Sequence, residues 1–384
     1  MGGRPSVRPP FTHGCHSEEV RIATFNVENL FDRARILAAE TWDVHQEDLE
    51  ALAELTRVLQ QDVYAEADRA RIVELLVLLG LTASDTGPLV RLRQNRGRLV
   101  RRTKDGPLEV VAHGRGDWIG WVELLRDSPT ELALRHTAQV VVDLAPDVLG
   151  VVEAESRLAL RRFSETLVEP QAGWGFDHVM LVDGNDDRGI DVGILTRGRP
   201  VGRITSHVDD EVDGQRIFSR DCPELEVLLP SGRTLVVLLN HLKSKGYGGA
   251  RESARIRRRQ AQRVRELYDA RIAGGDELVV VMGDLNDTPD SDALAPLLDG
   301  GPRDISEHPA FDDGGWPGTY TTGRAGNKID YILCSPAVHE AISAAGVHRR
   351  GVWTASGRWE MYPTLTREVD AASDHAALWA DVDL

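Results

Sequence analysis

Short apolar runs bounded by polar residues recur along the chain. Four of them, RIATF, DVLGVV, TLVVLLN and ELVVVMG, contain β-branched residues and stop at a polar residue, which is typical of buried strands. Two later runs, YILC and AALWADV, come directly after their polar residues instead. Strands that run in opposite directions can therefore bring polar side chains to one edge of a sheet.

Helical spacing of apolar residues separates several of these strands. Residues 129–145 show this spacing and end before Pro146. A second helix is expected from about residue 252 to 273, because Gly274 and Gly275 follow it. This second helix is rich in arginine. The favoured explanation is a solvated face paired with acidic neighbours, and the alternative is a face turned toward phosphate.

Residues 34–128 differ in pattern from the rest of the chain. Residues 44–80 have the spacing of two amphipathic helices, and residues 98–114 have that of a hairpin with an Asp-Gly turn. A segment with Trp118 and Trp121 follows. We interpret the whole stretch as a large, mainly helical insertion packed on the main fold. We hypothesise that the two tryptophans roof the functional site and restrict its substrates.

The expected organisation is a single catalytic domain. A strand over residues 20–27 precedes the insertion and its apparent partners follow it, which argues against the alternative of a separate N-terminal domain. Residues 1–20 are expected to form a flexible leader, and residues 21–384 the catalytic domain with insertion 34–128. The N-terminus has no apolar segment typical of a signal peptide, so a cytoplasmic location is expected. No apolar run approaches the roughly 18 residues of a membrane span.

The balance of charge narrows the classes of function. Asp and Glu number 61 and Lys and Arg 45, so the formal net charge is −16. This balance argues against a module held to nucleic acid by a basic surface, but it suits an enzyme that holds a divalent metal with acidic side chains. Cys15, Cys222 and Cys334 are too few and too widely spaced for a disulfide scaffold or a thiolate zinc site.

Polar residues at the ends and starts of the expected strands form the candidate site. Carboxylates and an asparagine suit a hard ion such as Mg²⁺ or Mn²⁺, whereas histidines and lysine suit a phosphate. Each residue alone has a structural explanation as a turn former or cap, but together they indicate chemistry at phosphorus. The set comprises Asn26, Glu28, Glu153, His241, Asp284, Asn286, Asp330, Asp374 and His375.

Six motifs in order, TFNVENL, VVEAE, NHLKSK, GDLND, KIDYI and SDH, resemble the endonuclease/exonuclease/phosphatase family. That family includes pancreatic deoxyribonuclease, abasic-site endonucleases, neutral sphingomyelinases and inositol polyphosphate phosphatases. The motifs span residues 24 to 375. The resemblance implies an α/β fold, a four-layer α/β/β/α sandwich of two mostly antiparallel sheets, with the site at one rim.

The resemblance also implies metal ligands. Glu153 is similar to the principal metal ligand of the family. Asn26 and Glu28 stand where the family has an asparagine that orients water or metal and a second acidic group. Asp374 matches a further carboxylate on the metal side. One or two ions of Mg²⁺ or Mn²⁺ are expected.

Catalytic roles carry over in the same way. Asp284 matches the residue that orients or deprotonates the attacking water, and Asn286 matches one that holds a phosphate oxygen. Asp330 matches the carboxylate that fixes the final histidine, here His375. His241 matches a histidine that touches the scissile phosphate or assists the leaving group.

Several charged residues are candidates for binding phosphate or substrate. Lys243 is the first of them, with Lys245 and Lys328 further out. Arg188 and Asp191, in the run RGIDVGIL, are expected to face the site. A salt bridge at the entry to a strand explains that last pair equally well.

The resulting prediction is a metal-dependent phosphoric ester hydrolase that cleaves phosphodiesters by in-line attack of water. We expect a nuclease acting on DNA or RNA, with no obligate protein partner. The alternative is a phosphatase or phosphodiesterase of a small molecule or lipid headgroup, and a remote alternative is an inactive binding module. A dinuclear metallophosphatase would need further histidine ligands that NHLKSK and SDH do not supply.

Overall fold

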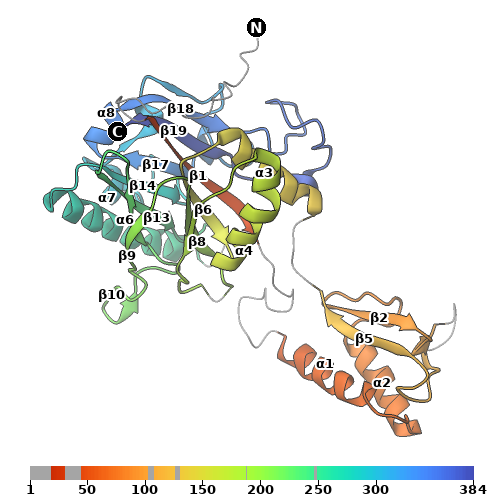
Figure 1. The fold of residues 1–384 in the computed structure, drawn as a ribbon. Helices are drawn as coiled ribbons and strands as arrows, with labels where there is room; N and C mark the ends of the chain where they lie inside the picture. The colour runs from red at the N-terminus through yellow and green to blue at the C-terminus, as the bar shows by residue number, and fades with distance from the viewer. Residues whose placement is uncertain (1–18, 31–44, 103–107, 126–129, 187, 246–248) are drawn as a thin grey trace.

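The computed structural model shows a mixed α/β fold with two large sheets (Figure 1). Most of the leader and the turn of the hairpin expected over residues 98–114 lie outside the described part. Among the described residues, no helix is both long and apolar enough to cross a membrane. The structure describes residues 19–30, 45–102, 108–125, 130–186, 188–245 and 249–384.

The first large sheet has β1 and β6 at its centre. These two strands are parallel, and β19 and β8 flank them in antiparallel orientation. Both central strands are buried on both faces over most of their length, which is typical of strands covered on both sides. In sheet order the strands are β16 (Phe311–Asp312), β18 (Ile342–His348), β19 (Ala377–Asp383), β1 (Glu19–Leu30), β6 (Val148–Ala154), β8 (Asp191–Thr196) and β7 (His178–Leu181).

The second large sheet has the parallel pair β13 and β14 at its centre, and its other pairs are antiparallel. Helix α6 (Ala250–Ala273) forms the crossover between these two parallel strands. In sheet order the strands are β15 (Arg303–Asp304), β17 (Asp330–Cys334), β14 (Val279–Asp284), β13 (Thr234–His241), β12 (Glu224–Leu228) and β9 (Val201–Thr205).

Three apolar clusters hold the layers together. Between the sheets, Ile22 and Val148 of the first pack in one cluster with Val237 and Val280 of the second. The other face of the first sheet packs on α3 (Glu131–Leu144) and α4 (Arg157–Phe163). The other face of the second sheet packs on α6. Each large apolar side chain buried in these clusters stabilises the fold by about 1.5–3 kcal/mol.

The arginines of α6 are mostly paired with acidic residues. Arg255 pairs with Glu252 at 2.7 Å, and Arg263 pairs with Asp210 at 2.7 Å. Arg265 pairs with its helical neighbour Asp269. These ion pairs agree with the favoured interpretation of the α6 arginines, a solvated face balanced by acidic neighbours.

The residues of the expected insertion have an apolar core of their own. The helices expected over residues 44–80 are α1 (Gln46–Leu59) and α2 (Glu66–Leu78), and they pack on the two-stranded sheet of β2 (Val90–Arg96) and β5 (Ile119–Leu124). The expected hairpin pairs β3 (Val100–Arg101) with β4 (Glu109–Val110). Trp118 is fully buried in this core and its Nε1 donates a hydrogen bond to the hydroxyl of Tyr64 at 3.0 Å.

Shorter elements complete the fold. The helical ones are a π-helical turn (Ser164–Val168), α5 (Glu169–Ala172), α7 (Ala295–Leu298), α8 (Pro336–Glu340) and 3₁₀ turns at Ile305–Glu307, Ala325–Asn327 and Glu368–Asp370; the strands are β10 (Glu211–Val212) and β11 (Gln215–Arg216).

Candidate active site

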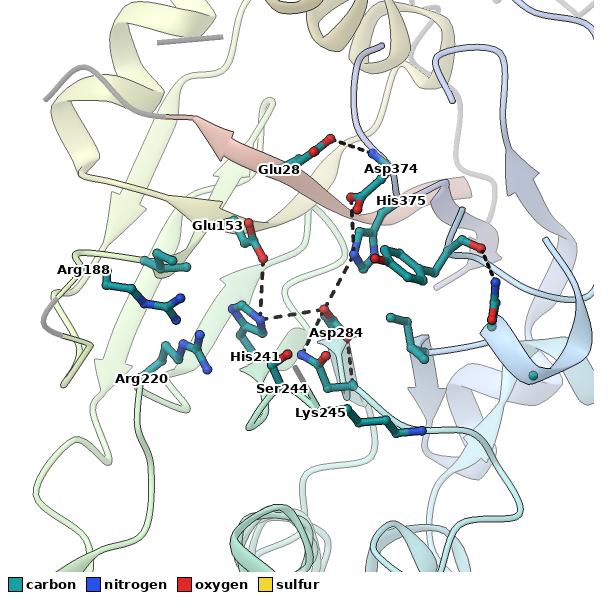
Figure 2. Close-up of a pocket in the computed structure, with 16 residues that line it drawn as sticks. Glu28, Glu153, Arg188, Arg220, His241, Ser244, Lys245, Asp284, Asp374 and His375 are labelled. Atoms are coloured by element: carbon teal, nitrogen blue, oxygen red, sulfur yellow. Dashed lines mark hydrogen bonds and ion pairs between the residues drawn. The ribbon is translucent and has the colours of Figure 1, made fainter. Parts of the chain in front are cut away.

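A cleft of about 420 Å³ lies where polar strand ends of the two large sheets meet (Figure 2). Two predicted residues, Asn26 and Asp330, lie behind its wall and are nearly fully buried. Strand register explains part of the gathering, since His241 at the end of β13 lies opposite Asp284 of β14. The predicted residues that line the cleft are Glu28, Glu153, Arg188, His241, Asp284, Asn286, Asp374 and His375.

The backbone is strained at three of these positions. Glu28, Glu153 and Asn286 have φ angles of 48°, 68° and 55°, in the left-handed region that disfavours residues with a Cβ. Irregular pairing follows Asn26 between β1 and β6, and interrupts β6 and β8 at Glu153. Such bulges re-aim side chains at sheet edges. They turn the two glutamates into the cleft.

Asn26 links the acidic residues of the site. Its Oδ1 accepts a hydrogen bond from the backbone N–H of Glu28 at 3.0 Å. Its Nδ2 lies 3.2 Å from Glu153 Oε1, 3.3 Å from Asp284 Oδ2 and 3.4 Å from His375 Nε2. One amide group has only two hydrogens. If His375 carries a proton on Nε2, both go to the carboxylates.

His375 is surrounded by carboxylates. Its Nδ1 lies 2.9 Å from Asp330 Oδ2. Burial favours the neutral ring, but the carboxylates of Asp330, Asp284 and Asp374 outweigh burial and raise the pKa of His375 well above its ordinary value. The surroundings of His375 therefore favour its charged form.

The surroundings of His241 favour its neutral form instead. Its Nε2 lies 3.8 Å from both Glu153 Oε1 and Asp284 Oδ2. Its buried Nδ1 has no hydrogen-bond partner within the part of the chain that the structure describes. Burial, with the positive charges of Arg220 and His375, lowers the pKa of His241 well below its ordinary value. The surroundings thus favour the neutral form of His241 and the charged form of His375, which suits two different roles.

Desolvation and neighbouring carboxylates disfavour the ionised forms of three carboxylates of the cleft. Desolvation and the neighbouring Asp374 raise the pKa of Glu28 to about 7, and desolvation and Asp330 raise the pKa of Asp284 to about 7. The pKa of Asp374 is also raised, chiefly by desolvation. A bound cation would relieve this repulsion.

The oxygen donors of the cleft fit a hard divalent ion. Glu28, Glu153 and Asp374 face the same side of the cleft in Figure 2, and Glu28 Oε2 accepts a hydrogen bond from the backbone N–H of Asp374 at 2.8 Å. Oxygen ligands of this kind suit Mg²⁺ or Mn²⁺. Asp284, Asp330 and His375 also lie close enough to share an ion. The Asp330–His375 hydrogen bond already uses two of those groups, and Glu28, Glu153 and Asp374 stay the predicted ligands.

Asn286 contacts Asp284 rather than open space. Its backbone N–H donates to Asp284 Oδ1 at 2.8 Å, and its Nδ2 donates to Asp284 Oδ2 at 3.2 Å and to the carbonyl of Leu242 at 3.1 Å. Both amide hydrogens are engaged. In the structure Asn286 therefore fixes the Asp284 carboxylate, whereas the sequence predicts a contact with a phosphate oxygen.

Three predicted binding residues do not line the cleft. Lys328 Nζ pairs with Asp304 at 2.5 Å, and Asp191 accepts a hydrogen bond from the backbone N–H of Gly184 at 2.9 Å and lines a neighbouring cavity. Lys243 is also absent from the cleft lining. Of the lysines considered, Lys245 is the one that reaches the cleft, where it pairs with Asp287.

The cleft also contains residues that sequence reasoning missed. Arg220, Ser244, Tyr320 and Asn327 line it. Ser244 lies inside the motif NHLKSK, so that motif could have pointed to it. The Tyr320 ring lies 4.9 Å from the His375 ring. Neither Trp118 nor Trp121 lines the cleft, and Trp118 is a core residue of the insertion.

The chain belongs to the Endonuclease/Exonuclease/phosphatase family, whose model matches residues 120–375. An endonuclease/exonuclease/phosphatase family protein from Bacteroides thetaiotaomicron has a similar structure, with 14% identity over 95% of both chains and a TM-score of 0.52. A family protein from Beutenbergia cavernae shares 19% identity over 67% of both chains, with a TM-score of 0.46. Truncated TDP2 from Caenorhabditis elegans shares 18% identity over 65% of this chain and 90% of its own, with a TM-score of 0.44. At 14% identity, the first of these similarities shows a shared fold alone. No curated protein sequence matches the chain.

Proposed function

We propose that the protein is a phosphodiesterase dependent on Mg²⁺ or Mn²⁺, and that it acts as a nuclease on DNA or RNA. The observation that carries this proposal is a single cleft that joins unneutralised carboxylates, the buried Asp284 and the cationic His375. Members of the family are in general metal-dependent hydrolases of phosphoric esters, which agrees with this combination.

Metal binding is assigned to Glu153, Glu28 and Asp374, with Asn26 positioning the two glutamates. A bound divalent ion supplies positive charge to the phosphate oxygens as negative charge develops there. The side-chain amide of Asn26 donates a hydrogen bond to Glu153 at 3.2 Å. Its Oδ1 accepts one from the backbone N–H of Glu28. The number of protein oxygens suits one ion at this position, and Asp284 would join a second.

Asp284 is assigned the role of general base. Its pKa of about 7 allows it to accept a proton from water near neutral pH. Asn286 and Asn26 hold the carboxylate in place. His375, fixed by Asp330, places positive charge beside the phosphoryl group, and the neutral His241 donates or accepts one hydrogen bond there.

The preference for a nucleic acid rests on the cations Lys245 and Arg188 at the cleft. A second candidate is hydrolysis of a small phosphate ester, because the net charge of −16 disfavours tight binding along a duplex and the cleft is small. The proposal includes one four-layer catalytic domain over residues 21–384, interrupted by insertion 34–128. It also includes a cytoplasmic location and no obligate protein partner.

A substrate panel tests the proposal. Purified protein with Mn²⁺ is incubated with plasmid, single-stranded oligonucleotide, p-nitrophenyl diester, p-nitrophenyl monoester and sphingomyelin. The Asp284→Asn variant, purified in parallel, controls for contaminating nucleases, and exposed Asp290→Asn is its matched control. Cleavage of the nucleic acids and the diester by wild type and Asp290→Asn alone supports the proposal. Preference for the monoester or sphingomyelin would overturn the nuclease assignment.

A further inference from the structure

Two arginines form one wall of the cleft. Arg188 and Arg220 both line it, and in Figure 2 both point toward the side where Glu153 and His241 lie. They come from different parts of the chain, since Arg188 precedes β8 and Arg220 precedes β12. The wall lies away from Lys245, which extends from the opposite side of the cleft in the same view.

A single carboxylate anchors both guanidinium groups. Arg188 donates from Nε and Nη2 to the two oxygens of Asp186, each at 3.0 Å. Arg220 Nε lies 2.9 Å from Asp186 Oδ2. One anion therefore gathers two planar guanidinium groups, the residue type that binds phosphate most readily.

Arg220 is unusual because it is a buried charge with donors left over. Its side chain is 4% exposed. Its buried Nε has no hydrogen-bond partner among the residues that the structure describes, although it lies within ion-pair distance of Asp186. Burial and the nearby Arg188 lower the pKa of Arg220, which is the expected sign of a cation lacking full compensation. A guanidinium in this situation gains most from an incoming anion.

The scissile phosphate has other partners. On the proposed function, the metal ligands, Asp284 and His375 surround the phosphoryl group that water attacks. The arginine wall lies beyond Glu153 and His241 from that centre (Figure 2). The cleft volume of about 420 Å³ leaves room for more than one phosphoryl group.

We propose that Arg188 and Arg220 form a subsite for a second phosphate of the substrate, adjacent to the phosphate that is cleaved. This inference rests on the proposed function and narrows its substrate class to esters with two neighbouring phosphates, such as a nucleic acid with a phosphate next to the cleaved bond. Arg188 and Arg220 are binding residues in this scheme, and Asp186 is a positioning residue.

The alternative is a purely structural role, in which the arginines hold the loop before β8. Two matched substrates separate these roles: thymidine 5′-(p-nitrophenyl phosphate) and the same compound with a 3′-phosphate. For the wild type, the added phosphate should raise kcat/KM by roughly tenfold to a hundredfold, the range of charge-assisted hydrogen bonds. In Arg220→Met the gain should fall to about threefold or less. Exposed Arg233→Met, the matched control, should keep the full gain.

Two further measurements distinguish a loss of binding from misfolding. They use the conservative variant Arg188→Lys and a melting assay. Arg188→Lys keeps the charge without the fork, so we expect it to retain only part of the gain. Inorganic pyrophosphate, added without metal, should raise the melting temperature of the wild type and of Arg233→Met but not that of Arg220→Met. Equal losses on both thymidine substrates, or pyrophosphate stabilisation unchanged in Arg220→Met, would overturn the subsite.

Failure of the proposed function has a different signature. If the wild type with Mn²⁺ hydrolyses neither thymidine compound, the phosphodiesterase assignment fails. The pyrophosphate assay then decides the subsite alone. Selective loss of stabilisation in Arg220→Met supports it, and equal stabilisation of all variants rejects it.

Discussion

The cleft and the insertion differ in the residues at which their backbone is left-handed. Left-handed backbone in the described part of the insertion occurs at glycines, Gly80 and Gly97, where it costs little. In the cleft it occurs at Glu28, Glu153 and Asn286, where each costs of order 1 kcal/mol or more.

The buried side chains of the two regions also differ in how well their surroundings satisfy them. The insertion buries Trp118 with its one polar atom satisfied by Tyr64, and its ion pairs are on the surface. The cleft buries Asp284 and His241 among charges that oppose their ionised forms. In the cleft, strained backbone and disfavoured charges therefore occur together at positions that a ligand could contact.

Glu153→Gln should have the largest effect on function. Loss of this ligand should lower kcat by on the order of 10³-fold and remove divalent binding seen by calorimetry, because the metal supplies most of the charge stabilisation. Glu155→Gln, two residues away and lining a different cavity, is the control and should bind the ion normally. Normal Mn²⁺ binding by Glu153→Gln would remove Glu153 from the metal site.

Trp118→Ala should destabilise the insertion and spare the chemistry. The change leaves a cavity in the insertion core and should cost about 3–5 kcal/mol of unfolding free energy, measured by urea denaturation. Trp121→Ala is the matched control. Its side chain is 44% exposed, so its cost should be small. A large loss of stability in Trp121→Ala, or a loss of kcat/KM on a small diester in folded Trp118→Ala, would contradict the separation of the two regions.

Asp284→Asn and His375→Ala should each lower kcat by about 10²-fold or more, the scale of general bases and charge-stabilising groups. Their effects on stability should differ. Asp284→Asn removes a carboxylate whose ionised form is disfavoured, so in chelator at pH 8 its melting temperature should match or exceed that of the wild type. His375→Ala breaks the pair with Asp330 and should melt earlier. Wild-type kcat in either variant would exclude that residue from the reaction.

The melting temperature in chelator should fall as pH rises from about 5 to 8. The fold raises the pKa of Asp284 from 3.8 to about 7 and that of Glu28 from 4.5 to about 7. Over this interval the folded chain keeps protons that the unfolded chain has released, so the free energy of unfolding decreases with pH. Saturating Mg²⁺ should flatten the dependence. A melting temperature that rises with pH in chelator would show that these carboxylates are already neutralised by the protein.

Much of the fold and of the cleft could be predicted from the sequence. The apolar runs marked the central strands, and the polar residues at their ends marked most of the cleft, because strand direction and register bring such ends together. The pairing of Asp330 with His375 followed from the resemblance and is present at 2.9 Å.

Other features depended on contacts that no local pattern contains. Lys328 was expected near the substrate, but a partner 24 residues earlier, Asp304, holds it elsewhere. Arg220 belongs to no recognised motif and became visible only through its burial beside Asp186. The low pKa of His241 depends on its burial, which strand pattern alone does not specify. The left-handed backbone at Glu28 and Glu153 runs against the preference of glutamate.

The central claim is that this cleft hydrolyses phosphodiesters with a divalent ion. The most direct measurement is turnover of a p-nitrophenyl diester by metal-stripped wild type and Glu153→Gln across a titration of Mn²⁺. The account predicts no turnover in excess chelator, recovery of wild-type activity as Mn²⁺ saturates, and no comparable recovery in Glu153→Gln. Full turnover in chelator, or equal recovery in both proteins, would contradict it.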